Sequence, residues 1–130
     1  GLDCRIVPAS DPVGEGTYNA AEFTPALIRD GEKIEDSFWT GEQPRACFGT
    51  GDQGVYMLII EGRYPDEGIR GTSVNTCSDI LLAYGCRNAL NMDGGSSAIL
   101  WYDGEYVTQC SSSFLRYTGG RPLPNAWVYG

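Results

Sequence analysis

The sequence predicts an α+β fold, with a single mixed or antiparallel sheet and at least one helix packed on it. Residues 55–60, VYMLII, form a β-branched and aromatic run of strand length, a pattern typical of a central strand buried on both faces. Residues 76–85 switch to helical spacing, and Asp-Gly dipeptides at 30–31 and 103–104 separate short apolar runs. A few local strands and one helix favour one sheet with the helix against it.

Strands are expected in six further segments. Residues 23–28 form a first strand, and residues 32–34 return from the turn. Residues 88–92 form a short strand after the helix, and a hairpin joins residues 98–102 to residues 105–108. Residues 125–129 form the last strand. Residues 1–19 are rich in Gly, Pro, Asp and Ser and form an irregular lead-in, so the predicted domain is 20–130.

The predicted helix has a start signal, a stop signal and an apolar stripe. Thr76 followed by Asp79 resembles a capping box, and Gly85 supplies the stop. The side chains that share the apolar stripe are Cys77, Ile80, Leu81 and Tyr84. This stripe is expected to pack on the sheet.

The charge balance excludes two classes of partner. The 130 residues carry a net charge of −8, which repels nucleic acid and anionic lipid. No apolar run approaches the roughly 20 residues that cross a bilayer, so we expect no membrane insertion. Lys33 is the only lysine among nine basic residues, and the other basic residues are Arg, which grips phosphate or carboxylate with two donors. This bias favours anion recognition; the alternative is that Arg pairs with the many carboxylates.

The side chains available for catalysis are restricted. The chain has no histidine, which removes Ser-His-Asp and Cys-His systems and leaves carboxylates, tyrosines or water for acid and base chemistry. Its five cysteines form no C-x-x-C pair, so a zinc ribbon is not expected. Nine helical residues between Cys77 and Cys86 would span about 13 Å, beyond the roughly 7 Å Cα limit of a disulfide. We expect mostly buried thiols and at most one or two bridges.

Polar residues gather between residues 91 and 97 and at strand ends. Two glycines allow the backbone to approach a ligand closely, so residues 91–97 are predicted to form the floor of a polar pocket. The alternative is a tight turn whose Asp and Ser cap local amides. Arg45 precedes the VYMLII strand, Glu61 and Arg63 follow it, and Arg121 lies between a glycine and a proline. Surface ion pairs are the alternative for these charges.

An ordered set of motifs resembles the phosphodiester glycosidase (NAGPA) domain family, in its C-terminal portion. The motifs are FTPALI with Asp-Gly, Pro-Arg with Gly49, Glu-Gly-Arg at 61–63, residues 79–91, DGGSS at 93–97 and GRPLPNA at 120–126. Glu61 stands where the family usually has Asp. The family's opening Asn-Gly-Gly-Phe motif is missing, so we expect a homo-oligomer or a further segment to complete the domain.

The resemblance implies hydrolysis of the sugar–phosphate bond in a glycosyl-1-phosphodiester, of the N-acetylglucosamine type or a related cell-surface glycan. Asp93 and Glu61 are the expected catalytic residues. Residues expected to bind substrate are Arg45, Arg63, Arg121, Asn91, Gly94, Gly95, Ser96, Ser97 and Asn125, with the three arginines converging on phosphate. No cofactor is required, although a divalent cation near Asp93 is an alternative.

A different class of function is also consistent with the sequence: a non-catalytic glycan-binding or structural knob domain of a phage-tail or cell-surface protein. Aromatic residues near the C-terminus could stack on sugars in either case. The family resemblance places the protein outside the cell, on the cell surface or on a virion. Residues 1–7 lack the features of a signal peptide, so we expect any export signal to lie outside this chain.

Overall fold

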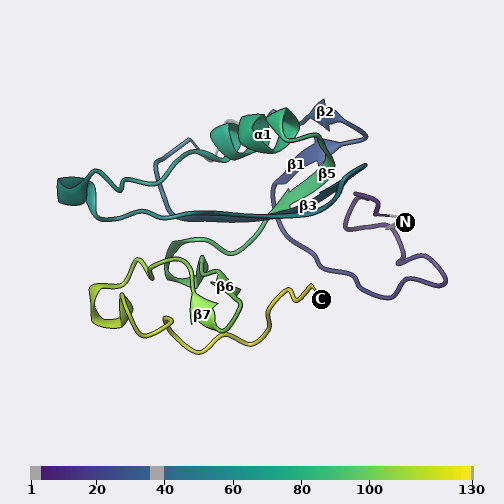
Figure 1. Ribbon diagram of the computed structural model, residues 1–130. Helices are drawn as coiled ribbons and strands as arrows, with labels where there is room; N and C mark the ends of the chain where they lie inside the picture. Colours follow the sequence, from purple (N-terminus) through teal and green to yellow (C-terminus); the bar gives the residue numbers. More distant parts are fainter. Residues whose placement is uncertain (1–3, 36–39, 130) are drawn as a thin grey trace.

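The computed structural model describes residues 4–35 and 40–129. Its main sheet contains five antiparallel strands in the order β2-β1-β5-β3-β4. Their bounds are β1 Ala26–Arg29, β2 Glu32–Lys33, β3 Arg45–Gly51, β4 Gly54–Ile60 and β5 Cys86–Asn91. Helix α1, Val74–Ala83, covers one face of this sheet (Figure 1). The predicted α+β fold is confirmed.

Smaller elements complete the described chain. A separate hairpin pairs β6, Trp101–Tyr102, with β7, Glu105–Tyr106, around the predicted turn. Three short 3-10 turns span Pro65–Glu67 (η1), Gly95–Ser97 (η2) and Ser113–Leu115 (η3). The hairpin and the C-terminal segment lie on the side of the sheet opposite α1 (Figure 1). No helix of the described residues is long and apolar enough to cross a membrane.

Helix α1 starts one turn earlier than the sequence predicts. Ser73 is the N-cap residue, and its side chain accepts a hydrogen bond of 3.1 Å from the Thr76 amide. The predicted cap at Thr76 is therefore wrong, because that residue supplies the capped amide. At the other end, the Tyr56 hydroxyl donates to the Tyr84 carbonyl over 2.9 Å and satisfies a terminal acceptor.

The hydrophobic core lies between α1 and the sheet. Eight buried side chains form it: Leu27, Ile28, Cys47, Val74, Cys77, Leu81, Cys86 and Ala89. They come from β1, β3, β5 and the helix, so the core depends on pairings distant in sequence. The central strand is β5, with β1 on one side and β3 on the other.

The VYMLII run is not central, contrary to prediction. It lies within β4, the last strand of the sheet, and every residue of β4 is half-buried. Its neighbour β3 was not predicted, because two glycines and a cysteine in its sequence weaken the strand pattern. Gly49 is needed there, since a Cβ atom at this position would lie 2.4 Å from the Cys86 sulfur.

Residues 125–129 form no strand, so that prediction is also wrong. Trp127 instead stacks on Phe48, with ring centroids 4.4 Å apart and planes inclined by 23°. Phe48 alternates with the core residue Cys47, so it projects from the sheet face that α1 does not cover. This contact attaches the C-terminal segment to that face.

All five cysteines are free thiols. The expectation that Cys77 and Cys86 do not pair is confirmed, and four of the five are buried. A hydrogen bond with Cys77 and burial both raise the pKa of the Cys47 thiol, so it is uncharged. Cys47, Cys77 and Cys86 therefore serve as small apolar residues of the core.

Arg116 anchors the segment after the hairpin. Its Nη1 donates to Glu67 Oε1 over 2.6 Å, a second bond joins Nη2 to Glu67 Oε2, and its guanidinium lies 3.8 Å from the centroid of the Tyr64 ring. The Tyr64 hydroxyl donates to the Cys110 carbonyl over 2.6 Å. The paired bonds from Arg116 lower the pKa of the Glu67 carboxyl below its ordinary value.

This ion pair predicts acid sensitivity. Because the pKa of Glu67 is lower in the folded state, its carboxylate stabilises the fold at pH values above its unfolded-state pKa of about 4.3. This contribution is lost as the pH falls through the folded-state pKa. We expect Glu67→Gln to reduce the loss of unfolding free energy between pH 7 and pH 3, measured by urea denaturation. Glu105→Gln, on exposed β7, is the control and should match the wild type. Identical acid sensitivity in the Glu67 variant and the wild type would contradict this role.

Candidate functional site

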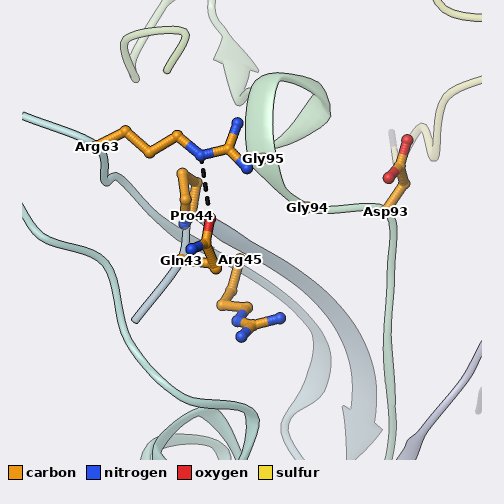
Figure 2. Close-up of a pocket in the computed structure, with 7 residues that line it drawn as sticks. All are labelled: Gln43, Pro44, Arg45, Arg63, Asp93, Gly94 and Gly95. Atoms are coloured by element: carbon orange, nitrogen blue, oxygen red, sulfur yellow. Dashed lines mark hydrogen bonds between the residues drawn. The ribbon is translucent and has the colours of Figure 1, made fainter. Parts of the chain in front are cut away.

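An open cleft of about 450 Å³ lies at one end of the main sheet. Its lining residues are Gln43, Pro44, Arg45, Arg63, Asp93, Gly94 and Gly95 (Figure 2). They come from the start of β3, the segment after β4 and the loop after β5. Because β3 runs antiparallel to both neighbours, its first residues lie beside the last residues of β4 and β5. Three motifs distant in sequence therefore meet at one sheet end.

The glycines after Asp93 allow two backbones to approach closely. The Gly95 amide donates to the Pro44 carbonyl over 3.0 Å, and a Cβ atom on Gly94 would lie 2.6 Å from the same oxygen. The following 3-10 turn is closed by the Ser97 amide, which donates to the Gly94 carbonyl over 3.1 Å. The alternative that residues 91–97 form a tight turn therefore explains why both positions are glycine. The Gly95 amide already donates to an acceptor within the protein. Of the two glycine amides proposed for substrate, Gly94 is the better placed.

Asp93 lies beside the guanidinium group of Arg121. Arg121 Nη2 donates to Ser97 Oγ over 2.6 Å and lies 3.4 Å from Asp93 Oδ2. The side chains of Arg121 and Asp93 are 48% and 65% exposed, so a ligand can displace water from both. The structure thus joins Asp93, Ser97 and Arg121 in one polar group at the edge of the cleft.

Arg63 approaches the same loop from the other side. Its backbone has a φ of 69°, which is uncommon for a residue with a side chain. Its Nε donates to Gln43 Oε1 over 3.0 Å, and its terminal nitrogens lie 3.2 Å from where a Gly95 Cβ would be. Figure 2 shows Arg63 reaching across Gln43 toward Gly95 while Asp93 stands at the far end of the loop.

Gln43 is a site residue that the sequence reasoning missed. It directly precedes the Pro44-Arg45 motif, which is the only signal the sequence offers for it. Its backbone exchanges hydrogen bonds of 3.2 and 3.0 Å with Thr72. Its side-chain oxygen orients the Arg63 guanidinium, so Gln43 holds that charge over the cleft.

Arg45 lines the cleft but uses its donors within the protein. Arg45 is only 5% exposed. Its Nε donates to the Thr72 carbonyl over 3.0 Å, and its Nη2 donates to the Gly41 carbonyl over 2.8 Å. In Figure 2 its guanidinium turns away from Arg63. Arg45 therefore braces the loop that carries Gln43, and its side chain does not converge with Arg63 in this structure.

Six of the predicted site residues lie outside the cleft lining: Ser97 and Arg121, which contact each other beside Asp93, and Glu61, Asn91, Ser96 and Asn125. Glu61 Oε1 accepts a 2.6 Å hydrogen bond from the Gln109 amide. Asn91 is buried, its Nδ2 donates to the Thr24 carbonyl over 3.1 Å, and its Oδ1 has no hydrogen-bond partner among the described residues. Ser96 contributes its carbonyl to the Cys110 thiol, and Asn125 is exposed in the segment after Arg121. The cleft is thus centred on Arg63, Asp93 and Gly94.

The charge around the cleft favours an anion. The described part of the chain contains no group of three or more Cys, Asp or Glu side chains placed to hold a metal ion. Arg63 and Arg121 flank the 93–97 loop, and two guanidinium groups disfavour a divalent cation beside Asp93. A phosphate group would satisfy donors that the protein leaves exposed.

Comparison with known proteins identifies relatives of this chain. Residues 4–129 match the family model of phosphodiester glycosidases. The chain is 25% identical over 118 residues to an SPbeta prophage-derived protein, YomE, of Bacillus subtilis (strain 168), covering 86% of this chain and 18% of that protein. A hypothetical protein from Synechocystis has a similar solved structure, with 26% identity, a TM-score of 0.55 and coverage of 68% of this chain. The match spans 18% of that second protein's length as well.

Proposed function

Because the chain belongs to the phosphodiester glycosidase family, we propose that it hydrolyses the sugar–phosphate bond of a glycosyl-1-phosphodiester. The observation that carries this proposal is the position of Asp93 on a loop flanked by Arg63 and Arg121. A carboxylate beside one guanidinium group, on a loop that a second guanidinium group approaches at Gly95, matches a reaction that needs an acid or base at the sugar and charge compensation at the phosphate.

The proposed roles follow from the exposed groups. Arg63 and Arg121 bind the phosphate oxygens, and the Ser97 hydroxyl and the Gly94 amide hold further substrate oxygens. Asp93 activates water or stabilises the positive charge that develops on the sugar ring. Phosphate is a good leaving group, so its binding by arginine contributes as much as proton donation.

Glu61 remains the proposed second carboxyl group, although one of its two oxygens is already engaged within the protein. One of its oxygens accepts from the Gln109 amide, so it would act through its other oxygen or after that bond breaks. Arg45 contributes its positive charge and its bracing of the Gln43 loop. Asn91 and Asn125 are proposed only as supporting residues, since neither lines the cleft.

The proposed substrates are N-acetylglucosamine phosphodiesters or related cell-surface glycans, because the family acts on phosphodiester-linked sugars. The proposed location is outside the cell, at its surface or on a virion. The prophage origin of the YomE protein is consistent with virion association. The substrate and the location are proposals, because the chain spans only 18% of the length of that relative.

The test is turnover by the purified chain of two substrates that share the sugar. An aryl N-acetylglucosamine phosphodiester should release free sugar, whereas the corresponding aryl N-acetylglucosaminide, which lacks phosphate, should not. Equal hydrolysis of both would contradict a phosphate-dependent site. Binding of the sugar phosphodiester without release would support the second candidate.

That second candidate is a non-catalytic glycan-binding or structural knob domain, and one observation favours it. Trp101, Tyr102 and Tyr106 on the β6–β7 hairpin are 60%, 73% and 56% exposed. Trp101 and Tyr106 are directly opposite in the ladder and share a face. Exposed aromatic rings of this kind stack on sugar rings.

The anion site makes a specific prediction. We expect Arg63→Lys to weaken inorganic phosphate binding about fivefold, because Lys cannot supply the two-pronged contact and loses the bond to Gln43. Isothermal titration with phosphate measures this, with Arg29→Lys, at the exposed last residue of β1, as the control that leaves binding unchanged. Unchanged phosphate affinity in Arg63→Lys would remove Arg63 from the site.

A further inference from the structure

We propose that the free edge of β4 is an interface through which two copies of this chain pair as antiparallel strands, joining their sheets into one. The inference is independent of the enzymatic proposal, since it uses none of the cleft side chains as reacting groups. It begins from the unexpected position of the VYMLII run at the end of the sheet.

The direction of the backbone groups on β4 follows from one hydrogen bond. The Ala46 carbonyl accepts from the Met92 amide over 2.8 Å, so Ala46 directs its backbone groups toward the β5 side. Ala46 pairs with Ile59, and that pair is therefore the non-hydrogen-bonded kind in the β3–β4 ladder. Ile59 consequently directs its N–H and C=O away from β3.

Alternation extends this result along the strand. Val55 and Met57 share the orientation of Ile59, so three N–H and three C=O groups point to the open edge. Among the described residues, no backbone group or side chain hydrogen-bonds to any of the three. A row of such groups is a template for another extended strand.

The chemistry of the edge is unusual for an unpaired strand. No charged residue and no proline occurs between Gly54 and Ile60, although the chain has a net charge of −8. Natural edge strands usually carry charges, proline or bulges that prevent pairing. All seven residues are half-buried, so their apolar side chains are partly open to water.

A second copy fits this edge because the edge is self-complementary. A two-fold axis at Met57 places Met57 opposite Met57 of the second copy and Val55 opposite Ile59, so all three outward residues pair with outward residues. Paired residues then lie on matching faces, and both α1 helices cover the same side.

Sedimentation velocity across a concentration series of the full chain tests the proposal. We expect the mass to rise from 14.1 kDa toward twice that value as concentration increases. Met57→Lys should raise the dissociation constant at least about tenfold, because it places two like charges directly opposite. Met57→Leu is the matched control and should dimerise like the wild type. A monomer at all concentrations, or a dimer unaffected by Met57→Lys, would overturn the proposal.

Hydrogen exchange of the wild-type chain gives a second test that needs no variant. In the dimer the amides of Val55, Met57 and Ile59 should be protected, and dilution to the monomer should speed their exchange at least about tenfold. The amides of Tyr56 and Leu58 bond to β3 and should stay protected throughout. Rapid exchange of the three outward amides at concentrations where dimer forms would place the interface elsewhere.

Discussion

Asp93→Asn is expected to lower hydrolysis of a sugar phosphodiester by about a hundredfold or more, the scale on which general acid–base groups contribute. Asn retains the size and turn-forming ability of Asp but removes the charge, so the free energy of unfolding should change by about 1 kcal/mol or less. The measurements are turnover under saturating substrate and urea denaturation of the same preparation.

Asp103→Asn is the matched control for this experiment. Asp103 also precedes a glycine and also occupies an exposed turn, with a φ of 48° that Asn adopts readily. It lies on the β6–β7 hairpin and does not line the cleft. We expect normal turnover and stability from this control. Normal turnover by Asp93→Asn as well would exclude Asp93 from catalysis and make Glu61 the leading candidate.

Gly71→Ala is expected to have the largest effect on stability. Gly71 has a φ of 97°, and a Cβ atom there would lie 2.4 Å from both the carbonyl carbon and the oxygen of Gln43. Neither neighbour is a flexible side-chain end, so the backbone bridge between Gln43 and Thr72 must open. The combined backbone strain and clash should cost about 3 kcal/mol or more of the free energy of unfolding.

Gly68→Ala separates the two causes of that loss. Gly68 has a φ of 78°, but nothing lies within 4 Å of its added Cβ. It should therefore show only the cost of a left-handed conformation, about 1 kcal/mol. Thermal or urea unfolding of both variants measures the difference. Equal losses for Gly68→Ala and Gly71→Ala would show that the Gln43–Thr72 bridge contributes little.

The sequence predicted elements that depend on local patterns. The turn at Asp103-Gly104, the body of α1 and the presence of β1, β2 and β5 each follow from periodicity or turn chemistry within a few residues. The position of VYMLII did not follow, because an apolar run looks the same at the centre of a sheet and at its edge. The pairing of β3 with β5 places β4 at the edge, and the sequence of β3 has only a weak strand pattern.

The candidate site was predictable to a similar extent. Arg63, Asp93 and Gly94, which line the cleft, were singled out because their motifs occur in a family order. The bracing role of Arg45 was not visible, since its acceptors are the backbone carbonyls of Gly41 and Thr72, and no sequence pattern reports them. Gln43 was missed for the same reason, because its importance arises from the contact with Arg63.

Because β3 runs antiparallel to β4 and β5, the two ends of the sheet are expected to differ in how well they tolerate substitutions. Residues 43–45, 61–63 and 93–95 gather at one end of the sheet, whereas the 52–53 turn and the 84–85 turn lie at the other, where Gly51 pairs with Cys86. Within one copy of the chain, the 52–53 turn therefore lies at the end of the sheet opposite the cleft. If the proposed function holds, substitutions at the cleft end are expected to affect it more than substitutions at the opposite end of the sheet.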